Sequence, residues 1–269
     1  MGFAMNTLLT RAGPVAYAEQ GSGPPLIMLH ANGHEHRDFD SVVEVLSQKY
    51  HTIAVDWPGF GASPAPQPPR TASASGLADM LEAIVAARAL EPAVFLGHSV
   101  GGFAAARLAI THPQWVRGLI LIAPGGFIGH TWFTRLFCRI KGSEAVTRVA
   151  ESLFARRYLK RHGPFVAAML DRIAIGQRNP PSVAVNAAVW RSFADPNHDL
   201  RADGADRCAN ADHPWKIRLC HPAAPNRADA PHYATKPDRG DGNRSCSVCR
   251  RFTDVSRDCR AISSAGCIR

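Results

Sequence analysis

A serine set among glycines is the feature of this chain best suited to chemistry. Ser99 lies within Gly97-His98-Ser99-Val100-Gly101-Gly102, which follows an apolar run and leads into a helical one. A serine in a strained turn between strand and helix needs glycine nearby, since side chains at Gly97 or Gly101 would collide with backbone. The backbone N–H groups at the start of a helix have no acceptor within the helix, so they can stabilise a negative charge. The pattern therefore predicts Ser99 as a nucleophile, with the Val100 N–H facing a developing oxyanion.

Strands and helices that alternate along the first part of the chain would hold this serine in place. Short apolar runs predict strands, and apolar residues three or four apart predict helices. The expected strands are 15–18, 26–29, 52–55, 93–96 and 119–123, and the expected helices are 39–46, 75–90 and 100–112. Asp38 is expected to cap the first helix. The alternation up to residue 124 predicts an α/β fold, a mostly parallel central sheet with helices on both faces.

Two further motifs precede the serine. Leu29-His30-Ala31-Asn32-Gly33 follows one predicted strand, and Asp56-Trp57-Pro58-Gly59-Phe60-Gly61-Ala62-Ser63 follows the next. With the serine motif, and in this order, they make residues 25–124 resemble the α/β-hydrolase superfamily, in the serine-nucleophile branch that carries a helical cap. The resemblance implies an α/β-hydrolase core over 1–124 and a helical cap or lid over 125–200.

The same resemblance implies a role for each residue of these motifs. Ser99 would attack an ester or related carbonyl carbon and form an acyl-enzyme, which water then hydrolyses. The backbone N–H groups of Ala31 and Val100 would form the oxyanion hole. His98, although adjacent to Ser99, is expected to point elsewhere. The residues expected to support the elbow and its neighbouring loop are His30, Gly97, His98 and Gly101. No cofactor and no metal is implied.

The class of substrate is only partly defined by these motifs. Serine at the nucleophile position argues against haloalkane dehalogenases and epoxide hydrolases, whose pattern has aspartate there. A small, apolar ester or related acyl substrate is expected, because esterases, lipases, thioesterases and carbon–carbon bond hydrolases remain. The alternative is a non-catalytic protein with a hydrolase-like fold that captures an apolar ligand under its cap.

The composition changes near residue 200. Residues 201–269 contain only seven Leu, Ile, Val and Phe residues but six of the seven cysteines. So few apolar residues cannot form a core layer, and the segment is expected to be irregular. The strands and last helix that the family would place there are missing, which should leave a sheet edge exposed.

The acid and the histidine of a serine hydrolase are also missing from the family's settings, G-x-x-D and a G-H turn. The histidines after Ser99 lack such a setting; they are His112, His130, His162, His198, His213, His221 and His232. A frameshift explains this loss. Reading from the second base of each codon after about Ala205, the sequence permits H-G-R-F-D and later G-H-V-P-F-A-E, the missing motifs in the missing order. We therefore expect the activity of this chain to be impaired.

A rival hypothesis is that the tail is native and binds zinc. Cys246 and Cys249 have C-x-x-C spacing, and Cys259 and Cys267 would complete four ligands. The second pair is too widely spaced for a typical zinc site, and few apolar residues are available to pack around one.

Charge and length exclude several other classes. The formal net charge is +9, but basic residues form no stripe with interleaved aromatics, so nucleic-acid binding is not expected. The first ten residues lack the pattern of a secretory signal, and no apolar stretch is long enough to span a bilayer. These observations predict a cytoplasmic protein with a small-molecule substrate and without a membrane span. The oligomeric state and the substrate's identity are not encoded in any motif.

Overall fold

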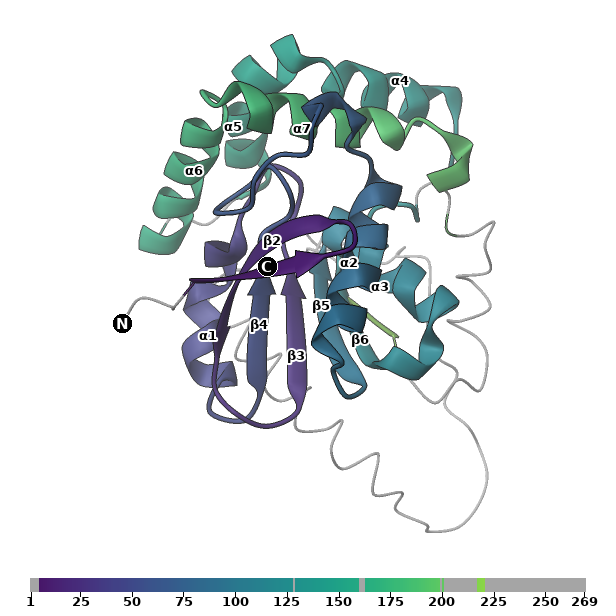
Figure 1. Ribbon diagram of the computed structural model, residues 1–269. Coiled ribbons are helices and arrows are strands. Elements are labelled where there is room, and N and C mark those ends of the chain that lie inside the picture. Colours follow the sequence, from purple (N-terminus) through teal and green to yellow (C-terminus); the bar gives the residue numbers. More distant parts are fainter. Residues whose placement is uncertain (1–4, 128, 160–162, 199, 201–216, 221–269) are drawn as a thin grey trace, which may run out of the picture. The chain divides into compact units, whose positions relative to one another are not determined.

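The computed structural model describes residues 5–127, 129–159, 163–198, 200 and 217–220. The described strands form one sheet of order β1-β2-β4-β3-β5-β6-β7 (Figure 1). These strands are β1 (Met5–Thr10), β2 (Gly13–Gln20), β3 (Pro25–Leu29), β4 (His51–Val55), β5 (Ala93–His98), β6 (Val116–Ile122) and β7 (Ile217–Cys220). The helices are α1 (Asp40–Leu46), α2 (Ala74–Arg88), α3 (Val100–Thr111), α4 (Trp132–Lys141), α5 (Glu144–Tyr158), α6 (Pro164–Gly176) and α7 (Pro180–Ser192).

Five neighbouring strands, from β4 to β7 in the sheet order, run parallel. β2 pairs antiparallel with both β4 and β1. All five residues of β3 are buried, as expected for a central strand covered on both faces. Figure 1 shows α1 on one side of the sheet and α2 and α3 on the other. The predicted α/β fold with a mostly parallel sheet is thus confirmed.

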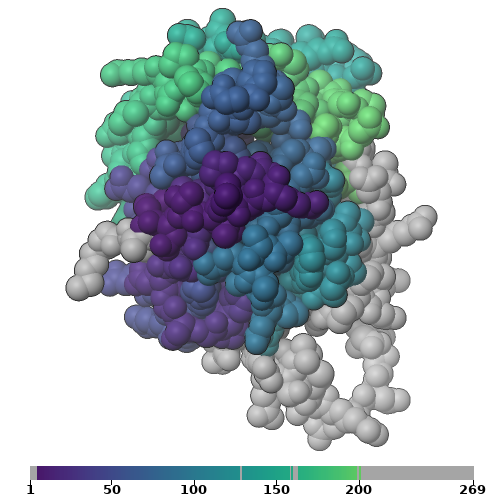
Figure 2. Space-filling view, viewed as in Figure 1, coloured from purple at the N-terminus to yellow at the C-terminus, as the bar shows by residue number. Residues whose placement is uncertain are grey.

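Strand β1 was not expected from the sequence. Its residues alternate between exposed and half-buried, and only Thr10 is buried, so the segment carries little apolar signal. β1 pairs with β2 from Met5 opposite Ala18 to Thr10 opposite Gly13, and it ends the sheet on that side. The two strands form a hairpin at the surface, purple in Figure 2.

The expectation that residues 201–269 are irregular is wrong for one short stretch. Ile217–Cys220 form β7, which pairs parallel with β6 from Leu119 to Ile122. Three of the four residues of Ile-Arg-Leu-Cys are apolar, so this short stretch is locally apolar although the segment as a whole has a low apolar content. The outer edge of β6 is therefore paired and not exposed.

Helices α4–α7 lie together beyond the carboxyl ends of the parallel strands (Figure 1). This group of four helices, called the cap helices below, packs on the rest of the fold chiefly through α7, whose residues Val185 and Val189 belong to the main core. Within the part of the chain that the structure describes, no helix is both long and apolar enough to cross a bilayer.

Candidate active site

Ser99 occupies the turn between β5 and α3. Its backbone has φ 54° and ψ −114°, a conformation that a non-glycine residue rarely adopts. Hydrogen bonds hold this turn: the Ser99 N–H donates to Ile122 O at 3.0 Å, and Ser99 O accepts from Gly125 N at 2.9 Å and from Phe103 N at 3.0 Å. The strain is thus imposed by the strand and the helix around the serine.

Glycines allow the backbone to pass closely beneath the turn. A Cβ atom on Gly97 would lie 2.5 Å from Gly101 O, and one on Gly101 would lie 2.4 Å from Leu29 O. Both contacts are with backbone, which cannot rotate away. The first turn of α3 therefore packs directly on the backbone at the end of β3, where Leu29 pairs with Gly97.

This contact brings the predicted oxyanion residues to one edge of the sheet. Val100 is the first residue of α3, so its N–H has no acceptor within the helix. Ala31 follows the end of β3 by two residues and is buried. Both residues thus follow or adjoin the carboxyl ends of β3 and β5, which are neighbouring parallel strands.

His30 is fully buried and held at both ring nitrogens. Nδ1 donates to Ala31 O at 2.7 Å, and Nε2 accepts from the Trp57 N–H at 2.9 Å. The Trp57 indole N–H donates in turn to His30 O at 2.9 Å. Burial lowers the His30 pKa to about 4, although the nearby Asp56 carboxylate favours the charged form. The ring is therefore neutral at pH 7, and its contacts tie the loop after β3 to the loop after β4.

Acid should therefore destabilise the fold through His30. A buried neutral histidine contributes stability above the unfolded pKa of about 6.5, and that contribution is lost as pH falls toward about 4. This loss is of the order of 3 kcal/mol for one histidine. We expect His30→Gln to be less stable than the unchanged chain at pH 7.5 but to lose less stability between pH 7.5 and 4.5. Urea unfolding at the two pH values measures both effects, and an unchanged pH dependence in the variant would contradict this assignment.

The ring of His98 contacts a second histidine. Its ring lies edge-on to that of His34, with centroids 6.1 Å apart. Burial and the charge of His34 lower the His98 pKa to about 4, so His98 is neutral at pH 7. His34 hydrogen-bonds through Nδ1 to Asp38 Oδ2. Burial disfavours charge on His34, but the Asp38 carboxylate outweighs it and raises the His34 pKa.

Asp38 does not cap helix α1 as expected. Its carboxylate faces His34 and also accepts from Arg172 Nη2 at 3.2 Å, while α1 starts without a side-chain cap. Burial would raise the Asp38 pKa, but His34 overcomes that effect and lowers it to about 2. The spacing of His34 and Asp38, four residues apart, was the available sequence signal for this pair; Arg172 is distant in sequence.

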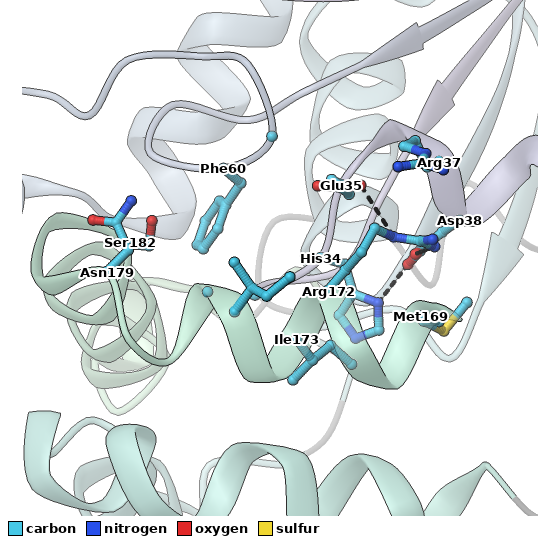
Figure 3. A pocket seen from close by; sticks show the side chains of 14 residues that line it. His34, Glu35, Arg37, Asp38, Phe60, Met169, Arg172, Ile173, Asn179 and Ser182 are labelled. Atoms are coloured by element: carbon cyan, nitrogen blue, oxygen red, sulfur yellow. Dashed lines mark hydrogen bonds and ion pairs between the residues drawn. The ribbon is translucent and has the colours of Figure 1, made fainter. Parts of the chain in front are cut away.

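A cavity of about 300 Å³ lies between the cap and the loops that follow β3 and β4. Figure 3 shows Arg172 reaching from α6 toward Glu35 and Asp38, with Phe60 and Met169 also at the cavity. The charged residues form ion pairs across the gap, with Arg172 Nε 3.0 Å from Glu35 Oε1. The residues that line the cavity include His34, whose ring contacts that of His98, but they do not include Ser99.

Two further hydrogen bonds join cap helix α7 to these loops. Asn32 Nδ2 donates to Asn186 O at 3.0 Å, and Ser182 Oγ donates to Gly59 O at 2.7 Å. The loop after β4 is itself closed by Asp56, whose carboxylate accepts from Ala62 N at 2.9 Å. The motif that begins at Asp56 thus shapes the wall of the cavity.

Most of the predicted acid and histidine region lies outside the described residues. The cysteines proposed as zinc ligands lie there too, and among the described residues no cluster of three or more His, Cys, Asp or Glu side chains is arranged to hold a metal ion. Of the histidines after the elbow, His112 stacks on Trp115 with ring centroids 4.1 Å apart. His198 lies 2.9 Å from Ser75 Oγ through Nε2. Neither of these contacts is with Ser99, and His112 Nδ1 also lies 3.9 Å from Glu82 Oε1.

Comparison with known proteins identifies the family. The family model described as the alpha/beta hydrolase fold matches residues 24–215, more than half of the chain, and the chain therefore belongs to this family. Over 167 residues it is 30% identical to a protein of Oryza sativa subsp. japonica for which 1-acylglycerol-3-phosphate O-acyltransferase activity is predicted. This match covers 59% of the chain and 40% of the rice protein, so the chain corresponds to about two fifths of that relative's length.

Solved structures show the same fold at lower identity. A Pseudomonas aeruginosa protein with predicted epoxide hydrolase activity matches with a TM-score of 0.66 and 21% identity, and the match covers 84% of this chain and 81% of that one. A Salmonella enterica protein with predicted acyltransferase activity matches with a TM-score of 0.64 and 24% identity, and the match covers 81% of this chain and 78% of that one. At these identities the likeness concerns the fold.

Proposed function

We propose that the protein is a serine hydrolase that cleaves a small, apolar ester or related acyl compound through an acyl-enzyme at Ser99. The observation that carries this proposal is the strained backbone of Ser99, with φ 54°, fixed between β5 and α3. Such strain persists only where the surrounding structure imposes it, and it commonly marks a site of chemistry. Serine on this turn of an α/β-hydrolase fold is a nucleophile in position.

The reaction would proceed in two steps. Ser99 Oγ attacks the carbonyl carbon, its proton passes to a base, and the bond to the leaving alkoxide breaks as that alkoxide gains a proton. Water then attacks the acyl carbon and releases the acid and the free serine. In both steps the N–H groups of Ala31 and Val100 would hold the oxyanion, and the α3 dipole would add to its stabilisation.

The cavity supports a small substrate. Its volume of about 300 Å³ is at the lower end of the range for ligand sites. Phe60, Met169 and Ile173 give it apolar walls. Arg172 is paired with Glu35 and Asp38, so its charge is already balanced. These features favour an apolar acyl group over an anion.

Acyl transfer to an alcohol is a second candidate, because predicted acyltransferases occur among both the sequence relatives and the solved structures. Both reactions share the acyl-enzyme and differ only in what attacks it. A hydroxyl group in place of water would yield a new ester.

The base is the part of the machinery that this chain lacks in the family's setting. Without it the Ser99 hydroxyl stays a weak nucleophile, and we propose that the activity of this chain is impaired. The alternative reading frame after about Ala205 would supply both the acid and the histidine.

Trapping of the acyl-enzyme tests the proposal. With p-nitrophenyl butyrate, the chain with the restored frame should release a burst of p-nitrophenol and carry a butyryl group on Ser99, whereas Ser99→Ala should do neither. Adding glycerol separates the two candidates, since a transferase makes glyceryl butyrate and a hydrolase makes butyrate. Tight binding of the ester with no burst would instead favour the non-catalytic binding protein.

A further inference from the structure

Helix α4 in the cap turns its apolar side chains toward solvent. Trp132, Phe133, Leu136 and Ile140 are exposed by 76%, 64%, 47% and 52%. We call these four residues the α4 apolar face. They follow the spacing of one helix side, since residues three and four apart are neighbours on a helix surface. So many large apolar side chains on one exposed helix indicate an interaction surface.

The opposite side of α4 faces the protein and is mostly polar, although Phe137 contacts Trp190 of α7, with ring centroids 5.8 Å apart. Thr134 and Cys138 are half-buried, and Lys141 is buried with its Nζ 2.5 Å from Glu151 Oε2. The Lys141 ammonium also lies 4.3 Å from the centroid of the Phe154 ring. A surface helix normally buries its apolar side and exposes its polar side. In α4 this arrangement is reversed, so packing within the described fold does not account for the apolar face.

The charges on α4 are of one sign. Arg135 and Arg139 are exposed and lie on one flank of the apolar face, one helical turn apart. No acidic residue occurs between Trp132 and Lys141. Aromatic side chains next to exposed arginines are typical of helices that lie in the plane of a membrane interface. The long arginine side chains can reach phosphate groups while the rings enter the acyl region.

We propose that α4 docks the cap on a membrane surface that contains anionic phospholipids. Two other occupants fit less well. Residues 201–269 hold few large apolar residues and an excess of basic ones, 13 against 8 acidic, so they would be repelled by Arg135 and Arg139. A second copy placed on the same face by two-fold symmetry would bring these arginines close to their equivalents.

This mode of binding has a defined dependence on lipid and salt. Each basic residue near an anionic surface adds attraction that salt screens, and the apolar face adds affinity that salt affects little. Binding should therefore be stronger to vesicles of equimolar phosphatidylcholine and phosphatidylglycerol than to phosphatidylcholine alone, by about tenfold or more.

Vesicle co-sedimentation of the full chain tests the proposal. Trp132→Ser combined with Phe133→Ser should abolish binding to both kinds of vesicle. Arg135→Glu combined with Arg139→Glu should remove the preference for phosphatidylglycerol. The matched controls are Leu9→Ser, since Leu9 is 79% exposed on β1, and Arg117→Glu, at an exposed position of β6. Both controls should bind as the unchanged chain does.

Three results would overturn the proposal. The first is no binding to the anionic vesicles by the unchanged chain. The second is equal loss of binding in the Leu9→Ser control, which would indicate non-specific adsorption. The third is an unchanged chain that does not bind vesicles but forms an oligomer in analytical ultracentrifugation, where Trp132→Ser combined with Phe133→Ser dissociates the oligomer. That result would assign the α4 apolar face to a second copy.

Discussion

Restoring the second reading frame after about Ala205 is expected to raise kcat/KM for p-nitrophenyl butyrate by about 10³-fold or more. The restored segment would supply the acid and the histidine that activate Ser99, and removing a single member of such a triad has effects of this size or larger. It would also supply the apolar residues that 201–269 lack. The unfolding transition of the restored chain should therefore move to higher denaturant concentration.

The matched control is the restored chain with Ser99→Ala, which should return to the background rate. Resequencing the gene across the codons for Asp199 to Asp212 checks whether a frameshift produced the present tail. An extra or missing base is expected there. An intact frame, together with no gain in kcat/KM on restoration, would contradict the frameshift hypothesis. Zinc near one equivalent in the purified chain would then favour the cysteine-rich tail as a native site.

Gly101→Ala is expected to destabilise the fold by about 3 kcal/mol or more and to remove any reactivity of Ser99. The new Cβ would lie 2.4 Å from Leu29 O, a backbone atom at the end of a fully buried strand. Relief of this clash requires α3 to move away from β3. Such a movement would separate the N–H groups of Val100 and Ala31 and so disrupt the proposed oxyanion hole.

Gly176→Ala is the matched control for this prediction. Gly176 ends helix α6, and nothing lies within 4 Å of the position that its Cβ would take. Alanine favours a helix over glycine by up to about 1 kcal/mol, so this variant should be as stable as the unchanged chain or slightly more so. Urea unfolding compares the two. Equal stability of both variants would show that the packing of the turn against β3 is not essential.

The parts of the fold that sequence reasoning predicted are those with a strong local signal. The run Ala93–Leu96 is fully buried as part of β5, and its apolar composition alone predicts a strand. The strain at Ser99 was expected because glycines flank it on both sides. β1 was missed because its residues are exposed or half-buried and carry little apolar signal. β7 was missed because it is short and pairs with β6, which is distant in sequence.

The site was predicted less completely than the fold. The motifs and the family resemblance predicted roles for Ser99, Ala31 and Val100, and these roles stay predictions. The ion pairs of Arg172 with Glu35 and Asp38 depend on how the cap closes over the core, and no local pattern encodes that contact. The reversed polarity of α4 was also missed, since periodicity shows that a helix is amphipathic but not which side faces the protein.

The central claim is that Ser99 is a nucleophile, and active-site labelling tests it most directly. The restored chain would be treated with a fluorophosphonate, and the modified residue would be located by peptide mass spectrometry. One adduct is expected, on Ser99, and it should form far more slowly in the present chain and not at all in Ser99→Ala. A restored chain that stays unlabelled at Ser99, or that is labelled at another serine, would contradict it.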